Sequence, residues 1–196
     1  MNDSSIPNIP KVYPQLEAKC KEIGFTMPSD IYIGTLLKSL IASKLKGNVL
    51  ELGTGIGLSL AWMIEGLDEH SNLISIDNDS ELIGIAKEFF SYDPRIQLIC
   101  TDGSTWINKY SGPAFDLIFA DAWPGKYSEL DETLQLLKVG GFYVIDDMNP
   151  QPSWPDGHAE KAENLVEYLK SREDFTMTKM NWSTGVILCT KKINMI

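Results

Sequence analysis

The sequence predicts an α/β fold: a doubly wound, mostly parallel sheet of seven strands, with helices on both faces and a C-terminal antiparallel hairpin. Three observations support this prediction. After residue 46, short apolar runs alternate with stretches of helical periodicity. The runs are apolar throughout, which is typical of parallel strands buried on both faces. The last two runs follow each other with no helical stretch between them, as in a hairpin.

The first 46 residues differ from the rest. Residues 1–10 are polar and indicate a loose tail, whereas leucines and isoleucines at helical spacing predict helices from Lys11 to Lys46. Pro28, Ser29 and Asp30 are a typical helix start. We therefore expect one domain over residues 1–196, with a tail and helices over 1–46 and a ligand-binding core over 47–196.

The core is predicted element by element. We expect strands over 48–52, 72–76, 96–100, 115–120 and 142–145, and a hairpin from 174–180 and 185–190. Helices are expected over 58–64, after Asn78, over 129–137 and over 159–169. Asn78 with Glu81 three residues later resembles a capping box. The pair Gly140-Gly141 is expected to end the third of these helices.

Four successive strands are each followed by an acid: Asp77, Asp102, Asp121 and Asp146. In a doubly wound sheet, ligands bind at the carboxyl ends of the strands. Aspartate is also common in helix caps and turns, which would explain any one of these residues alone. Four in succession on the ligand-binding edge favour a functional site.

The segment ELGTGIGLS, residues 51–59, follows the first strand and opens a helix. Its glycines at 53, 55 and 57 allow a sharp turn and close approach to a ligand. The lysine of a phosphate-binding P-loop is missing, and the spacing GxGxG differs from the GxGxxG of nicotinamide-binding proteins. Glu51 would repel a pyrophosphate but suits a positively charged ligand. With Asp77 accepting from ribose hydroxyls and Asp102 from an adenine amino group, the pattern describes S-adenosylmethionine.

The sequence resembles the class I S-adenosylmethionine-dependent methyltransferases, and most of all the small O-methyltransferases of the catechol and caffeoyl-CoA type. The resemblance spans residues 27–190 and rests on LELGTGIGLS, ISIDND, CTDGS, FDLIFADAWPGKY and GGFYVIDDMNP. It implies the Rossmann-like methyltransferase fold. It also implies the cofactor-binding residues: Gly53, Gly55 and Gly57 in the loop, Glu51 and Ser59 at the methionine end, Asp77 at the ribose, Asp102 at the adenine, and Asp121.

Metal-dependent relatives suggest a second set of residues. The resemblance places three metal ligands at Asp121, Asp146 and Asp147, which suits Mg²⁺ or another divalent cation that prefers oxygen ligands. The third position is an asparagine in those relatives and an aspartate here. The added charge would tighten metal binding. The alternative is that Asp147 serves as a cap or turn residue and no metal is used.

The general base departs from the family pattern. Catechol-type relatives carry a lysine in a DADK stretch, where this chain has Pro124. Lys126 and His158 could replace this lysine as the general base, so the catalytic candidates are Asp121, Lys126 and His158. The alternative for Lys126 is a solvated side chain without a catalytic role, and the alternative for His158 is a surface or capping histidine. Trp123 and Trp154 on the same two loops suggest a pocket for a flat or apolar acceptor, or packing of the loops.

Composition limits the partners. The formal net charge is -10, from 17 basic and 27 acidic residues, which argues against nucleic acid or an anionic membrane as main partner. No signal peptide and no membrane-spanning apolar run is recognised. Three scattered cysteines, among them Cys100 and Cys189 in apolar runs, are expected to be small buried residues of a cytoplasmic protein.

We therefore predict an enzyme that transfers a methyl group from S-adenosylmethionine to a small-molecule acceptor, with oxygen as the favoured acceptor atom. The alternatives are a nicotinamide-dependent oxidoreductase and a non-catalytic S-adenosylmethionine-binding domain; the missing lysine motivates the latter. The resemblance also suggests a homodimer. The acceptor, the use of a metal, the base and the oligomeric state stay open.

Overall fold

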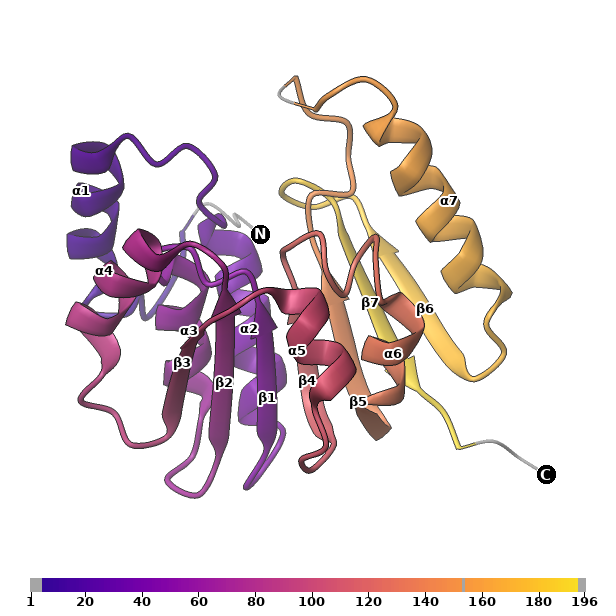
Figure 1. Ribbon diagram of the computed structural model, residues 1–196, viewed down its shortest axis with the longest axis horizontal. Helices are drawn as coiled ribbons and strands as arrows, with labels where there is room; N and C mark the ends of the chain where they lie inside the picture. The colour runs from indigo at the N-terminus through magenta and orange to yellow at the C-terminus, as the bar shows by residue number, and fades with distance from the viewer. Residues whose placement is uncertain (1–4, 153, 194–196) are drawn as a thin grey trace.

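The computed structural model describes residues 5–152 and 154–193, and its centre is a single sheet of seven strands (Figure 1). The strand order is β3-β2-β1-β4-β5-β7-β6. β1 to β5 run parallel, whereas β7 is antiparallel to both β5 and β6. The predicted fold class is therefore confirmed. The strands are β1 Asn48–Leu52, β2 Asn72–Asp77, β3 Ile96–Cys100, β4 Phe115–Ala120, β5 Leu137–Ile145, β6 Phe175–Met180 and β7 Val186–Lys191.

Helices cover both faces of this sheet. They are α1 Tyr13–Ile23, α2 Ile31–Ala42, α3 Leu58–Gly66, α4 Ser80–Phe90, α5 Gly103–Lys109, α6 Leu130–Gln135 and α7 His158–Ser171. Successive residues of a strand belong to two separate cores on the two faces of the sheet. Val49 of β1 lies in the core formed with α1 to α4, and its neighbour Leu50 lies in the core formed with α5 to α7. This two-sided burial explains why the strands are apolar throughout.

Two helix starts test the predicted caps. Asp30 caps α2, because its carboxylate accepts hydrogen bonds from the backbone N–H groups of Tyr32 and Ile33. The predicted cap of α4 at Asn78 is wrong by one residue. Asp79 is the cap and accepts from the N–H groups of Glu81 and Leu82. Asn78 instead lines a cavity at the end of β2.

The segment around Gly140 also differs from the prediction. α6 ends at Gln135, and β5 already begins at Leu137 and runs through the glycine pair. Gly140 has a φ of 76°, and the pairing of β4 with β5 shifts register between Phe115 and Leu117. The two glycines therefore lie inside an irregular strand and do not end a helix. The short polar helix α5 was not predicted from the sequence.

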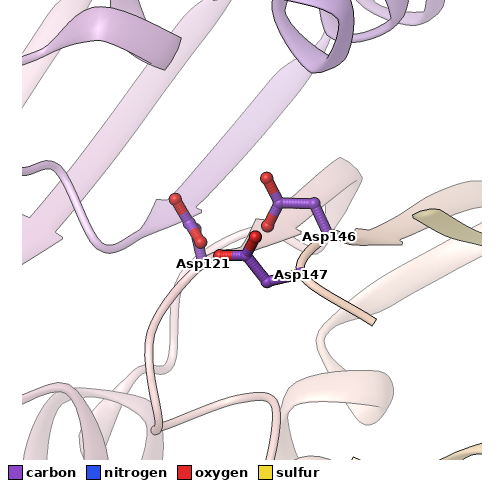
Figure 2. Close-up of side chains that lie close together, drawn as sticks. All are labelled: Asp121, Asp146 and Asp147. Carbon is purple, nitrogen blue, oxygen red and sulfur yellow. The ribbon is translucent and has the colours of Figure 1, made fainter. Parts of the chain in front are cut away.

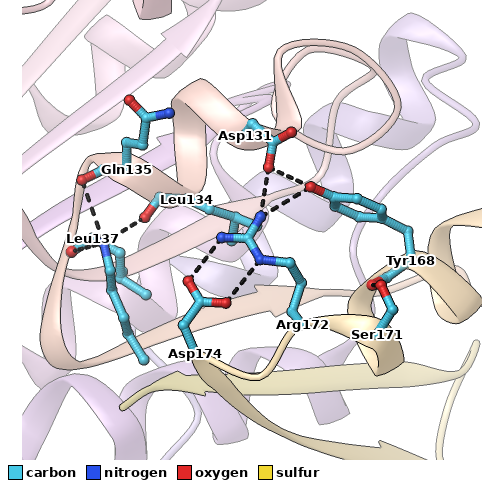
Figure 3. A network of polar contacts seen from close by, with 9 residues as sticks. Asp131, Leu134, Gln135, Leu137, Tyr168, Ser171, Arg172 and Asp174 are labelled. Atoms are coloured by element: carbon cyan, nitrogen blue, oxygen red, sulfur yellow. Dashed lines mark hydrogen bonds and ion pairs between the residues drawn. The ribbon is translucent and has the colours of Figure 1, made fainter. Parts of the chain in front are cut away.

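A polar network joins the end of α7 to the sheet (Figure 3). The Arg172 guanidinium donates to both carboxylate oxygens of Asp174 at 2.8 Å and to Asp131 of α6 at 2.5 Å. The Tyr168 hydroxyl donates to the same Asp131 carboxylate. Lys191 of β7 donates to backbone carbonyls at the end of α6 and the start of β5. These contacts join α6 to α7 and fix both helices to the adjoining ends of β5, β6 and β7.

The cysteines correct one detail of the sequence analysis. All three are free; Cys20 and Cys189 are buried, but Cys100 is exposed. It ends β3, which has a partner on one side only and forms the edge of the sheet. Of the helices in the described part of the chain, none has the length and apolar character that a membrane span requires.

Candidate active site

Packing against the protein requires glycine at two positions of the loop after β1. Gly53 has a φ of 101°, and a Cβ atom there would lie 2.6 Å from the backbone oxygen of Asp121. Gly57 has a φ of 97°, and a Cβ atom would lie 2.5 Å from the ring of Phe90. Both positions thus require glycine even without a ligand. The loop is held to β2, because the Gly55 N–H donates to Asp77 Oδ2 at 2.9 Å.

A cavity of about 230 Å³ opens beside this loop at the carboxyl ends of the strands. Its lining includes Gly53, Asp77, Asp102 and Trp123, so the structure brings the two predicted nucleoside-binding acids together. Asp102 Oδ1 accepts from the Thr105 N–H at 2.7 Å and caps α5. Hydrogen bonds from Thr105 hold the pKa of Asp102 below its ordinary value. Trp123 lines this cavity, a position that the sequence analysis did not assign to it.

Glu51 and Ser59 lie behind the glycine loop, outside the residues that line the cavity. Glu51 is fully buried, and its two oxygens accept hydrogen bonds from Ser59 and from Ser75, each at 2.5 Å. Burial raises the pKa of Glu51 from 4.5 to about 8, although the two serine hydrogen bonds act in the opposite direction. Contact of Glu51 and Ser59 with the methionine end of a cofactor stays a prediction. Ser75 was missed, although a serine inside the apolar run NLISI is a signal for such a buried contact.

Three carboxylates meet at the ends of β4 and β5 (Figure 2). Asp121, Asp146 and Asp147 each offer an oxygen, and these oxygens lie within 4.8 Å of one another. Two adjacent parallel strands bring them together, because their carboxyl ends share one edge of the sheet. Ser29, just before α2, donates from its hydroxyl to Asp121 Oδ2 at 2.9 Å. The predicted metal ligands are therefore neighbours in space.

The charges of this cluster favour a cation. Burial raises the pKa of Asp121 to about 6 and the pKa of Asp146 well above its ordinary value, and Asp147 adds to both effects. Asp146 is only 2% exposed, and its Oδ1 atom is buried without a hydrogen-bond partner in the described structure. A buried carboxylate oxygen needs a partner. The three carboxylates thus fit a hard divalent cation such as Mg²⁺.

The two predicted bases have different surroundings. Lys126 is 5% exposed, and its Nζ donates to the backbone carbonyl of Asp146 at 2.7 Å, so the alternative of a solvated lysine is wrong. His158 begins α7, and its Nε2 lies 3.2 Å from the Tyr127 hydroxyl. Its Nδ1 is buried without a partner in the described structure. Burial lowers the pKa of His158, so the ring is neutral at pH 7.

Aromatic side chains surround His158. The centroid of the Trp154 ring lies 4.4 Å from that of His158, and those of Trp123 and Tyr127 lie at 5.7 Å and 5.1 Å. The predicted aromatic pair thus joins one cluster, and Tyr127 belongs to it although the sequence analysis did not single it out. Trp154 also lines a second cavity of about 520 Å³.

The antiparallel strand β7, a glycine loop beside a cavity lined by two acids, and a neighbouring carboxylate cluster together form the kind of site that a methyltransferase fold carries. A model of the O-methyltransferase family matches residues 14–192, and the chain belongs to that family. The nicotinamide alternative finds no support in this match.

Curated relatives carry names of the same family, and solved structures share the fold. A Mycobacterium ulcerans protein, provisionally named an O-methyltransferase, is 26% identical over 81% of this chain and 75% of its own length. A similarly named Mycobacterium marinum protein is 32% identical over 58% of this chain, but the match spans only about half, 53%, of that protein. The fold is similar to that of the Streptomyces achromogenes O-methyltransferase TomG, solved in complex with SAM, with a TM-score of 0.83 and 19% identity over 97% of this chain and 93% of the other.

Proposed function

We propose that the protein transfers a methyl group from S-adenosylmethionine to an oxygen atom of a small-molecule acceptor. The observation that carries the proposal is the closeness of two sites. The cavity that contains Asp77 and Asp102 shares a wall with the carboxylate cluster, because Gly53 of the cavity packs directly on the backbone of Asp121. A nucleoside cofactor in the cavity therefore lies beside the place where an acceptor hydroxyl would be held.

The chain's own residues have three tasks in this proposal. Asp77 and Asp102 would bind the ribose and the adenine, and Trp123, which lines the same cavity, would supply apolar contact. Asp121, Asp146 and Asp147 hold a divalent cation. When bound, the cofactor supplies a methyl group already activated on its sulfonium, and the metal supplies positive charge that favours the ionised acceptor hydroxyl. Alignment of the reacting atoms is then the main contribution of the protein.

The acceptor hydroxyl must lose a proton as the oxygen–methyl bond forms. We assign the proton to His158, because burial lowers its pKa and so favours the neutral, proton-accepting ring at pH 7. The Tyr127 hydroxyl near Nε2 fixes the orientation of the ring. Lys126 is less suited to this task, because its Nζ is already engaged with the carbonyl of Asp146.

We further propose that residues 1–196 form one domain that acts in the cytoplasm. Three free cysteines support the location, since thiols stay reduced there. The net charge of -10 supports a small-molecule acceptor over a nucleic acid. A homodimer is proposed from the family resemblance alone and is tested by light scattering.

The first test is calorimetric titration with S-adenosylhomocysteine, with NAD as the control ligand. We expect micromolar affinity, about -8 kcal/mol, and no binding of NAD. Asp77→Ala should weaken the affinity at least tenfold, because the ribose loses its acceptor. Glu81→Ala, on the exposed start of α4, should leave it unchanged. Saturable binding of NAD, or equal affinity in the Asp77 variant, would contradict the assignment.

The metal is tested separately. We expect EDTA to abolish turnover and added Mg²⁺ to restore it. Asp146→Asn should weaken Mg²⁺ binding, measured by calorimetry, at least tenfold while S-adenosylhomocysteine still binds. Full turnover in EDTA would remove the metal from the mechanism and leave the methyl transfer itself intact.

A further inference from the structure

Asp147 of the carboxylate cluster has an unusual backbone conformation. Its φ is 52°, in the left-handed region that residues other than glycine rarely adopt. Aspartate enters this region more readily than most residues, but the conformation persists only where the surrounding structure holds it. The direction of the Asp147 carboxylate relative to Asp121 and Asp146 depends on this conformation. The surrounding structure here is the turn between β6 and β7, residues 181–185.

The β6–β7 turn accepts three successive hydrogen bonds from the segment that follows β5. The Asp147 N–H donates to Thr184 Oγ1 at 3.3 Å. The Met148 N–H donates to the Gly185 carbonyl at 3.0 Å, and the Asn149 N–H donates to the Thr184 carbonyl at 2.8 Å. The backbone of Asp147 and of the two residues after it is therefore held by this turn.

Gly185 is the place where the turn and the segment after β5 touch most closely. Its φ is 91°, and a Cβ atom there would lie 2.6 Å from the backbone nitrogen of Asn149 and 2.6 Å from its Cγ. The Gly185 N–H donates to the Trp182 carbonyl at 3.0 Å and closes the turn. A single added methyl group would therefore push the segment after β5 away from the turn.

The same turn is joined to the other side of the carboxylate cluster. The Ser183 hydroxyl donates to the carboxylate of Asp30, the cap of α2. Ser29, next to Asp30, donates to Asp121 Oδ2 at 2.9 Å. Hydrogen bonds and adjacent residues thus lead from Asp121 through the start of α2 and the β6–β7 turn to Asp147. The turn is therefore in contact with the surroundings of both ends of the cluster.

We propose that the β6–β7 turn positions Asp147 as a metal ligand and sets its place relative to Asp121. This role rests on the proposed metal site and deepens it, because it identifies the part of the chain that sets the geometry of the site. Loss of a group that orients a metal ligand typically weakens metal binding about 10–100-fold. None of the residues that line the nucleoside cavity in the described structure belongs to the turn, so cofactor binding should not depend on it.

The first test replaces Gly185 by alanine and uses Gly140→Ala as the matched control. Both glycines have a left-handed φ, 91° and 76°, but a Cβ atom at Gly140 meets no atom within 4 Å. Mg²⁺ binding is measured by calorimetry with the full chain saturated with S-adenosylhomocysteine. We expect Gly185→Ala to weaken Mg²⁺ binding at least tenfold and Gly140→Ala to change it less than twofold. Equal Mg²⁺ affinity in Gly185→Ala and the wild type would overturn the proposal.

A second pair of variants keeps the test decisive where Gly185→Ala does not fold. Thr184→Val is similar in shape but lacks the oxygen that accepts from the Asp147 N–H, whereas Thr184→Ser keeps an oxygen there. We expect Thr184→Val to weaken Mg²⁺ binding at least threefold and Thr184→Ser to stay within twofold of the wild type. An equal loss in both variants, or no loss in Thr184→Val, would refute the role of the turn.

The affinity for S-adenosylhomocysteine, measured first in each protein, separates the possible failures. We expect it to stay within twofold of the wild type in every variant. A loss of Mg²⁺ binding that is matched by an equal loss of S-adenosylhomocysteine binding would indicate general damage and contradict a specific positioning role. No Mg²⁺ binding by a wild type that binds S-adenosylhomocysteine would overturn this inference together with the metal assignment, and would leave the proposed cofactor site intact.

Discussion

Replacement of Glu51 by glutamine should make the protein more stable at pH 8 and leave its stability almost unchanged at pH 5. Glu51 is fully buried, and burial raises its pKa from 4.5 to about 8. An acid whose pKa is raised by folding stabilises the fold fully only below its unfolded pKa. As the pH rises from about 4.5 to 8, ionisation of this residue stabilises the unfolded chain but not the folded chain, so the free energy of unfolding falls.

The size of the effect follows from the shift. Each pKa unit corresponds to about 1.4 kcal/mol, so the rise from 4.5 to about 8 sets an upper limit near ~5 kcal/mol on the stability lost by pH 8. Relaxation and water entry reduce this value, and a few kcal/mol is the realistic expectation. Glutamine has a similar shape and keeps both an acceptor and a donor for Ser59 and Ser75. It therefore removes the titration without opening a cavity.

The assay is urea unfolding of both proteins at pH 5, 6.5 and 8, followed by circular dichroism. The free energy of unfolding of the variant minus that of the wild type should increase steadily with pH. The exposed Glu81→Gln serves as control and should give a difference that does not change with pH. A difference that is constant for Glu51→Gln, or that decreases towards pH 8, would show that Glu51 is ionised in the folded protein and would refute the reasoning.

Two further predictions concern stability and reactivity. Tyr143→Phe should lower the free energy of unfolding by about 1–3 kcal/mol in chemical denaturation, because the buried hydroxyl donates to the Gly125 carbonyl at 2.6 Å and its loss leaves that oxygen unpaired. An unchanged midpoint would mean that water replaces the hydroxyl. A maleimide should label Cys100 rapidly in the native protein and should reach Cys20 and Cys189 only after denaturation, as read by mass spectrometry. Rapid labelling of all three would contradict the burial described here.

Much of the fold could be predicted because the signals are local. The strand NVLEL was expected over 48–52 and lies at Asn48–Leu52, since an apolar run between polar residues has few alternatives. The sequence predictions failed where one sequence pattern is compatible with two local structures. A glycine pair can end a helix or relieve a strand, and only the register of β5 against β4 decides for the strand. Cys100 is the last residue of an apolar run, but its exposure depends on β3 being the edge strand.

The candidate site also has features that the sequence predicts and features that it does not. The chain order of strands and acids predicted that Asp121 and Asp146 lie on one edge of the sheet, because parallel strands bring their ends together. That Asp147 joins them as a third neighbour was implied by the family resemblance, and the structure places the three carboxylates together. What could not be predicted is the direction of each side chain. Lys126 points inward to the carbonyl of Asp146, and Glu51 faces two serines behind the loop. The sequence shows which residues are near these two side chains in the chain, but not which way each side chain turns, and no spacing rule reports that.

The reversed strand has a consequence for how the protein is made. β7 follows β6 in the chain but lies between β5 and β6 in the sheet, and in the described structure β6 pairs with β7 alone. During synthesis, β1 to β5 can assemble as the chain leaves the ribosome, but β6 must wait without a partner until β7 emerges. Until then β5 is an open edge beside the carboxylate cluster. The edge of the sheet beside the carboxylate cluster is thus completed only after β6 has been translated, and a nascent chain stalled before residue 186 presents an exposed strand to its neighbours.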